Sequence, residues 1–109
     1  MHAQLVTFRL NGISERDYHE SCGSLTGTFA ALPGLLGKAW LRDLASGTYG
    51  GIYLWRDRAS CEAYVNGPVF AAVKADARLR DVVSRDFGVF DDLTLATLPG
   101  VRLVSPQTA

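Results

Sequence analysis

The sequence contains few cysteines and no long hydrophobic run, and each shortage excludes a class of protein. Two cysteines among 109 residues are too few for a disulfide framework, which predicts a reducing, cytoplasmic setting. No apolar stretch approaches the roughly 20 residues that a transmembrane helix needs. The first residues, 1–4, lack the basic and apolar regions of a signal peptide. We therefore expect a cytoplasmic protein without a membrane partner.

Neither sign of charge is in excess. Eleven Lys and Arg residues balance eleven Asp and Glu residues, so no overall field attracts the chain to nucleic acid or to an anionic surface. The hydrophobic content of 48% is typical of a globular domain. A single domain of this size buries only about 60–65% of its unfolded surface, which favours association with a second copy.

Alternating apolar residues predict four strands. The first ends at the turn-forming pair Asn11-Gly12, and the second and third form a hairpin around residues 45–47. We expect Val6, Phe8 and Leu10 to share one face of the first strand. The predicted strands are Ala3–Leu10, Leu35–Asp43, Thr48–Trp55 and Val82–Phe90.

Capping residues and breakers predict three helical segments. The first begins near Ser14 and runs to about Leu32, where Pro33-Gly34 ends it. The second begins near Asp57 and covers 59–65, and the third runs from Val69 to about Leu79. Residues 93–98 have some strand character, and a tail follows from residue 99.

The predicted order of elements is β-α-β followed by β-α(α)-β. This order is typical of the split βαβ, or ferredoxin-like, α+β fold, in which a four-stranded antiparallel sheet carries helices on one face. We expect one domain over residues 1–98 and a C-terminal tail over residues 99–109.

Alternation divides the predicted hairpin into two faces. The pattern places Leu35, Gly37 and Ala39 on a small, apolar face and Leu36 on the other. A cavity for a flat, partly anionic ligand is one interpretation of this second face, with Gly51 leaving space, and core packing is the alternative. We call this second face the mixed face. Its residues are Leu36, Lys38, Trp40, Arg42, Tyr49, Tyr53 and Trp55.

The same residues resemble a known family. The stretch Gly50–Trp55 (GGIYLW), an Asp-led helix containing Ala63-Tyr64, and the closing strand 82–90 are similar to the YdhR-like monooxygenases of the dimeric α/β-barrel superfamily. Pro33-Gly34-Leu35 and Lys38-Ala39-Trp40 fit the same pattern. The resemblance covers roughly residues 5–94.

This resemblance implies a homodimer formed through the sheet and a cavity between each sheet and its own helices. Relatives among the antibiotic-biosynthesis monooxygenases oxidise phenolic polyketides of secondary metabolism to quinones without metal or flavin. Trp55 matches a Trp that lines their cavity, whereas Gly51 stands where they often have Asn. Haem-degrading relatives carry a His ligand in the region where this chain has Val65 and Asn66, so we expect no haem.

Several side chains are candidates for the chemistry of such a site. His19 is the one histidine expected within a folded element, because His2 is terminal, and it is a candidate for proton transfer. Arg42 and Lys38 are candidates for stabilising an oxyanion. Trp40, Tyr53, Trp55 and Tyr64 are expected to bind the substrate. Glu15, His19 and Cys22 share a helix face, but the mixed set predicts no metal site.

Three functional hypotheses follow. The first is a cofactor-independent monooxygenase that oxidises an aromatic or polycyclic phenol, with molecular oxygen as co-substrate. The second is a non-oxidative cyclase or isomerase on the same barrel, which Gly51 favours. The third is a module that binds a small ligand without catalysis.

Overall fold

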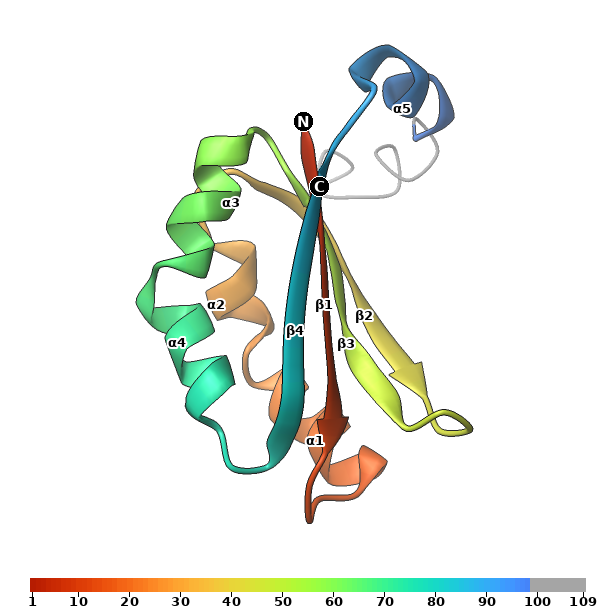
Figure 1. Ribbon diagram of the computed structural model, residues 1–109, viewed down its shortest axis with the longest axis vertical. Helices are drawn as coiled ribbons and strands as arrows, with labels where there is room; N and C mark the ends of the chain where they lie inside the picture. The colour runs from red at the N-terminus through yellow and green to blue at the C-terminus, as the bar shows by residue number, and fades with distance from the viewer. Residues whose placement is uncertain (99–109) are drawn as a thin grey trace.

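The structure is a computed structural model that describes residues 1–98, in which a four-stranded antiparallel sheet carries helices on one face (Figure 1). The strand order is β2-β3-β1-β4, so the two strands nearest the centre are β3 and β1. This arrangement confirms the predicted ferredoxin-like α+β fold. The strands are β1 (His2–Leu10), β2 (Leu35–Asp43), β3 (Thr48–Trp55) and β4 (Leu79–Gly88), and the helices are α1 (Glu15–Gly23), α2 (Thr26–Ala30), α3 (Arg58–Val65), α4 (Pro68–Ala75) and α5 (Asp91–Thr97).

Side chains on β1 alternate between a buried and a less buried face. Val6 and Phe8 lie in the core and Leu10 packs against it, as predicted. His2 and Gln4 occupy the same face nearer the start of the strand, and both are buried. The expectation that His2 lies outside the folded elements is therefore wrong, because the pairing of β1 with β3 and β4 begins at residue 2.

Two side-chain caps fix where helices begin. The hydroxyl of Ser14 accepts a hydrogen bond from the backbone N–H of Asp17, and the carboxylate of Asp57 accepts one from Ser60. These bonds satisfy backbone donors that the first turn of a helix leaves unpaired. The predicted starts near Ser14 and Asp57 are confirmed.

The predicted helix from Ser14 to Leu32 is two helices, α1 and α2, with a break at residues 24–25. Near the break the Ser24 hydroxyl donates to the carbonyl of Ser21, and the Thr26 hydroxyl donates to the carbonyl of Gly23. Side chains that bond local carbonyls compete with the helix, and a nearby glycine weakens it further. The prediction of one continuous helix was wrong for this reason.

Two boundaries near the C-terminus also differ from the prediction. Helix α4 ends at Ala75, because the Asp76 carboxylate accepts the backbone N–H of Arg78 and closes a turn, and β4 then begins at Leu79. The segment with predicted strand character, 93–98, lies mostly in helix α5, whose first turn carries Asp91 and Asp92. The predicted tail, 99–109, lies outside the described residues.

A bulge in β2 changes the faces of its first residues. Leu35 pairs with Trp55 and Gly37 with Leu54, so Leu36 is an extra residue between them. Leu35 therefore packs against the core, while Leu36 is exposed. The prediction placed Leu36 on the mixed face and Leu35 on the other face, and the bulge reverses this assignment. From Lys38 onward the predicted hairpin register holds, with Lys38 opposite Tyr53.

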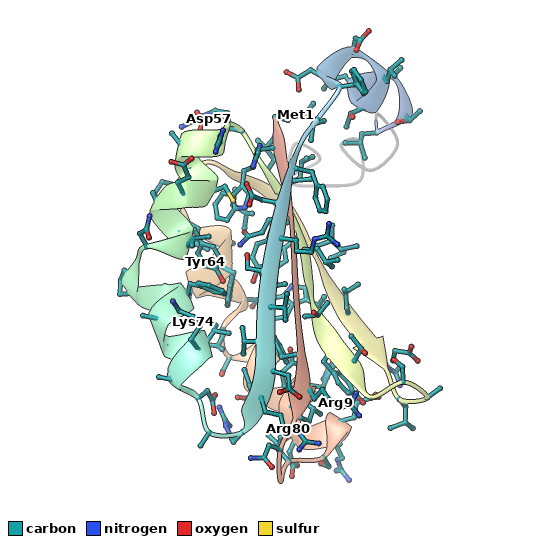
Figure 2. The ribbon with its side chains drawn as sticks, viewed as in Figure 1. Met1, Arg9, Asp57, Tyr64, Lys74 and Arg80 are labelled. Carbon is teal, nitrogen blue, oxygen red and sulfur yellow. The ribbon has the colours of Figure 1, made fainter. Side chains whose placement is uncertain are left out.

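The core lies between the sheet and the helices and contains most of the aromatic residues of the chain. Tyr64 extends from α3 toward the sheet (Figure 2). Within residues 1–98, helices α1–α4 lie on one face of the sheet and no helix covers the opposite face (Figure 1), where Ile52, Val83 and Phe87 are about half exposed. Among residues 1–98, no helix is long and apolar enough to cross a membrane.

Gly50 allows the close approach of β3 to β1. Its φ is +146°, and a Cβ atom at this position would overlap the carbonyl oxygen of Val6. We expect Gly50→Ala to lower the free energy of unfolding by more than about 2 kcal/mol, measured by urea denaturation. Gly27→Ala is the matched control, because a Cβ there meets open space within a helix. Equal stability of the two variants would contradict this reading of Gly50.

Candidate functional site

A cavity of about 340 Å³ lies between the mixed face of the hairpin and the helices. Side chains from β2 and β3 form one wall, and residues of α1, α2 and α4 form the other. The lining is mostly apolar, which suits an organic ligand held by a few polar groups. Its aromatic and polar members include Tyr18, Cys22, Phe29, Lys38, Trp40 and Tyr53.

Lys38 is the cavity's most unusual group, because its amine lies among aromatic rings. The Nζ atom is 3.5 Å from the ring centre of Phe29, 3.4 Å from that of Trp40 and 4.7 Å from that of Tyr53. Burial lowers the pKa of Lys38 to about 7, because an ammonium ion loses hydration there. The ring faces attract the ammonium form and oppose this effect. The amine therefore exchanges protons near neutral pH.

Gly51 makes room for the Lys38 side chain. Gly51 on β3 pairs with Trp40 on β2. The neighbouring pair on the same face of the hairpin is Lys38 with Tyr53. A Cβ atom on Gly51 would lie 2.7 Å from Cε of Lys38. The space predicted beside Gly51 is thus filled by the aliphatic part of the Lys38 side chain, which passes over Gly51 to reach the cavity.

An aromatic layer lies beside the cavity. Trp55 is fully buried and stacks on Tyr53, with ring planes 2° apart. The polar tips of the layer are paired, since Trp55 Nε1 donates to Gln4 at 2.9 Å and the hydroxyls of Tyr53 and Tyr64 are 3.0 Å apart. Burial raises the pKa of both tyrosines, so their hydroxyls stay protonated. Trp55 and Tyr64 support the cavity wall without belonging to its lining.

The predicted catalytic residues lie in a second, adjacent hollow. His19 and Arg42 line it together with Trp40, which the two spaces share. Arg42 forms an ion pair with Glu15, whose other carboxylate oxygen accepts the hydroxyl of Tyr49. The Tyr49 hydroxyl and the Arg42 guanidinium hold the pKa of Glu15 below its ordinary value. Arg42 is thus already paired with an anion, whereas Lys38 forms no ion pair within residues 1–98 and its amine lies against aromatic rings.

The structure therefore divides the predicted site residues into three groups. Lys38, Trp40 and Tyr53 meet in the cavity, His19 and Arg42 lie in the neighbouring hollow, and Trp55 and Tyr64 stand behind the wall. Their roles remain predictions.

Sequence reasoning missed three groups of this site. Phe29 and Tyr18 come from helices whose orientation the pattern did not fix, although both are aromatic residues in helical segments. Gln4, the partner of Trp55, is a polar residue within an apolar alternation. A buried polar residue in such a position requires a partner, which was the available sign.

Solved structures of low sequence identity share this fold. The haem degrader MhuD of Mycobacterium tuberculosis, with two haems bound in its active site, is 17% identical, and the match covers 83% of this chain and 96% of that chain with a TM-score of 0.66. SnoaB, a cofactor-independent oxygenase of Streptomyces nogalater, is 19% identical over 81% of this chain and 91% of that chain, with a TM-score of 0.64.

A third structure, a protein of unknown function from Nitrosomonas europaea, is 21% identical over 82% of this chain and 88% of that chain, with a TM-score of 0.68. Among curated proteins, none matches this sequence. The family described as "Putative mono-oxygenase ydhR" matches residues 4–98. The chain therefore belongs to the ydhR mono-oxygenase family.

Proposed function

We propose that the protein is a cofactor-independent monooxygenase that oxidises a phenolic aromatic molecule bound in the 340 Å³ cavity. The observation that carries the proposal is the Lys38 amine, held among aromatic rings inside an apolar cavity. Membership of a mono-oxygenase family supports the reaction class. The cofactor-independent oxygenase SnoaB shows that this fold is compatible with such chemistry.

The shape and chemistry of the lining support an aromatic phenol as substrate class. The rings of Phe29, Trp40 and Tyr53 offer faces and edges to a flat ligand. The lysine amine is the group placed to accept a phenolic proton, and the resulting ammonium then pairs with the phenolate oxygen. A polycyclic, polyketide-like phenol of secondary metabolism is the substrate that we propose.

In the proposed reaction the substrate itself supplies the electrons. Neutral Lys38 takes the phenolic proton, and the phenolate transfers an electron pair from a ring carbon to molecular oxygen, forming a carbon–oxygen bond. The lysine ammonium returns its proton to the peroxide oxygen, and the hydroperoxide so formed loses the remaining hydrogen of that carbon as the oxygen–oxygen bond breaks. Water leaves, and the carbon becomes a quinone carbonyl. One oxygen atom enters the product and the other enters water, so neither metal nor flavin takes part.

The neighbouring hollow gives His19 and Arg42 a place in this scheme. Both are exposed and lie next to Trp40, at the wall that the cavity and the hollow share. We assign His19 to the exchange of protons with solvent and Arg42, held by Glu15, to attraction of the anionic product. Trp55 and Tyr64 hold the rings of the wall in place.

A non-oxidative cyclase or isomerase is the second candidate. Gly51 provides no polar side chain to hold oxygen, and the space above it is taken by the lysine stem. A neutral amine in an apolar cavity can also remove a proton next to a carbonyl group, and this step needs no oxidant. The two candidates share Lys38 and differ in their need for oxygen.

We also propose that two copies of the chain associate through the open faces of their sheets. This face carries Ile52 on β3 and Val83 and Phe87 on β4, each about half exposed. Exposed apolar side chains gathered on one sheet face are costly in water and are typical of an interface. A second copy offers a matching surface, as symmetry in homodimers requires.

The first prediction concerns oxygen. Anthrones and naphthols incubated with the protein in air should give quinone absorption faster than without protein, and the increase should disappear under argon. Equal change with and without oxygen would assign the cavity to the second candidate. Quenching of Trp fluorescence without product in either gas would indicate a binding module, and no response of either kind would contradict the proposal.

The second prediction separates Lys38 from lysine in general. Lys38→Met should lower the turnover rate by about 100-fold or more, because the proton acceptor is lost. Lys74→Met is the matched control, because the Lys74 side chain is exposed on α4 (Figure 2). In the unsubstituted protein the rate should rise with pH and level off above about 7, as the amine form becomes dominant. A flat pH profile, or equal rates for the two variants, would exclude Lys38 as the base.

The third prediction concerns stability and pH. The folded protein loses the Lys38 proton near pH 7, whereas the unfolded chain holds it to about 10.5, so the unfolded state binds more protons between these values. The free energy of unfolding should therefore rise with pH in this window. Lys38→Met should be more stable than the unsubstituted protein at pH 6, by roughly 1–2 kcal/mol, and the difference should shrink by pH 10. A constant difference across this range would show that the lysine is not desolvated.

The fourth prediction concerns assembly. Ile52→Glu places a charge in the open face and should convert the dimer to a monomer in sedimentation velocity experiments. Leu44→Glu is the control, because Leu44 is exposed in the turn between β2 and β3, away from this face. A monomeric unsubstituted protein, or a dimer insensitive to both changes, would refute the proposed interface.

A further inference from the structure

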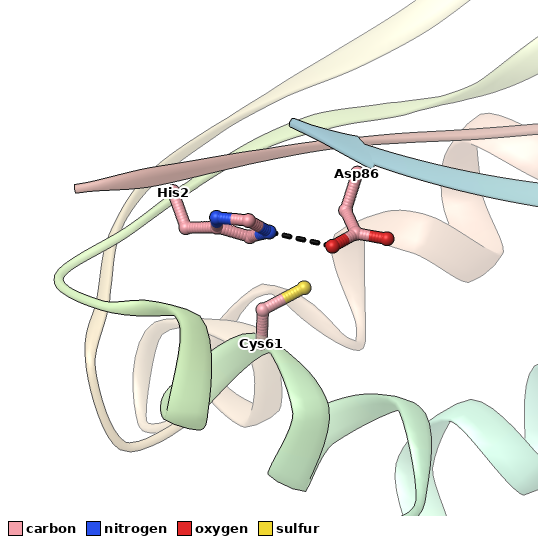
Figure 3. Close-up of side chains that lie close together, drawn as sticks. All are labelled: His2, Cys61 and Asp86. Atoms are coloured by element: carbon pink, nitrogen blue, oxygen red, sulfur yellow. Dashed lines mark hydrogen bonds and ion pairs between the residues drawn. The ribbon is translucent and has the colours of Figure 1, made fainter. Parts of the chain in front are cut away.

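Three side chains with metal-binding atoms converge at the end of the sheet where β1 begins and β4 ends (Figure 3). His2 comes from β1, Cys61 from α3 and Asp86 from β4, so the residues are far apart in sequence. Nε2 of His2 is 2.5 Å from a carboxylate oxygen of Asp86, and the three potential ligand atoms lie within 4.8 Å of one another. His2 and Cys61 are buried, whereas Asp86 is exposed.

The fold itself brings the three groups together. Gln4 lies directly opposite Asp86 in the β1–β4 ladder, so His2, two residues away, shares the helix-facing side with both. The cap at Asp57 starts α3 directly after β3, and its first turn carries Cys61 over this end of the sheet. Three separately anchored backbones therefore fix the positions of the imidazole, the thiol and the carboxylate.

We propose that His2, Cys61 and Asp86 form a binding site for a soft or borderline divalent cation of the zinc class. Thiolate sulfur, imidazole nitrogen and carboxylate oxygen are the three ligand types that zinc takes in proteins. Two buried ligands and one exposed ligand leave a path by which an ion and a coordinated water could enter. The thiol proton is released to solvent when the ion binds.

The distances require only a small adjustment. Tetrahedral zinc, with bonds of about 2.0–2.3 Å, places its ligand atoms about 3.3–3.8 Å apart. The bond between His2 and Asp86 must therefore open by about an ångström, and the sulfur must move inward by a similar amount at most. Asp86 lies on the edge strand β4 and is exposed, so its carboxylate is free to make this movement.

This site is separate from the cavity. None of the three residues belongs to the cavity lining, and Gln4, which lies beside them, bonds to Trp55 and Ser84. An ion here would join β1, α3 and β4 by three bonds without contacting the substrate. Its role is therefore structural, and the proposal does not depend on the reaction assigned to the cavity. The set differs from Glu15, His19 and Cys22, the group for which the sequence predicted no metal.

The test uses the full chain without a polyhistidine tag, stripped of metal by a chelator that is then removed. Titration with Co²⁺ should produce the near-ultraviolet charge-transfer absorption of a cobalt–thiolate bond, saturating at one ion per chain, and Zn²⁺ should abolish it by displacement. Zn²⁺ should also raise the Tm of the protein, because the ion binds the folded state.

Substitutions of the three ligands should separate this site from nonspecific binding. Cys61→Ser should abolish the thiolate band, and Asp86→Asn, an exposed change that leaves the core intact, should weaken Zn²⁺ binding at least about tenfold. Cys22→Ser and His19→Gln are the matched controls and should bind as the unsubstituted protein does. The Tm of each metal-free variant checks that it folds.

Three results would overturn the proposal. The first is the absence of a cobalt–thiolate band in the folded, unsubstituted protein at millimolar Co²⁺. The second is a band that survives Cys61→Ser but is lost in Cys22→Ser, which would assign the binding to the other cysteine. Retention of full Zn²⁺ affinity in Asp86→Asn would likewise exclude the three-ligand site.

Discussion

The aromatic layer between the sheet and the helices is the constraint on which the rest of the structure depends. Trp55 is fully buried, and its stacking with Tyr53 and contact with Tyr64 join β3 to α3. Such rings bring a large apolar area into the core, but each polar tip that enters with them must find a partner. Gln4 accepts the indole N–H of Trp55, and the hydroxyls of Tyr53 and Tyr64 bond to each other. Within residues 1–98 no fully buried side-chain nitrogen or oxygen lacks a hydrogen bond.

The same layer creates the environment of the amine. Lys38 lies opposite Tyr53 and reaches the rings because Gly51 has no side chain in its path. Burial makes its ammonium form costly, while the ring faces recover part of that cost without neutralising the charge. A carboxylate in place of the rings would have kept the lysine protonated, as Glu15 keeps Arg42 occupied nearby. Within residues 1–98 no carboxylate forms an ion pair with Lys38, and the amine is therefore available for proton exchange.

Much of this arrangement was predictable from the sequence. Alternation from Lys38 to Trp55 determined which side chains share the mixed face, because a hairpin with a short turn has a single well-defined register. The bulge at Leu36 was not predictable in the same way. One extra residue among neighbouring apolar residues does not produce a recognisable sequence pattern. The break after Gly23 depends on hydroxyl bonds that compete with helix propensity by only about 1 kcal/mol. The helical form of 93–97 is favoured by the acidic first turn of α5.

The parts of the site that the sequence did not reveal share one physical cause. Phe29, Tyr18 and His2 are positioned by how helices and strands pack, and pattern reasoning fixes the periodicity of an element but not its rotation or its neighbours. The broken helix illustrates this point. Because the chain turns between α1 and α2, Tyr18 and Phe29 approach the hairpin from two directions and leave a space between them that one straight helix would have filled differently. The cavity lining therefore includes residues on both sides of the break, and the hydroxyl bonds made by Ser24 and Thr26 lie between them.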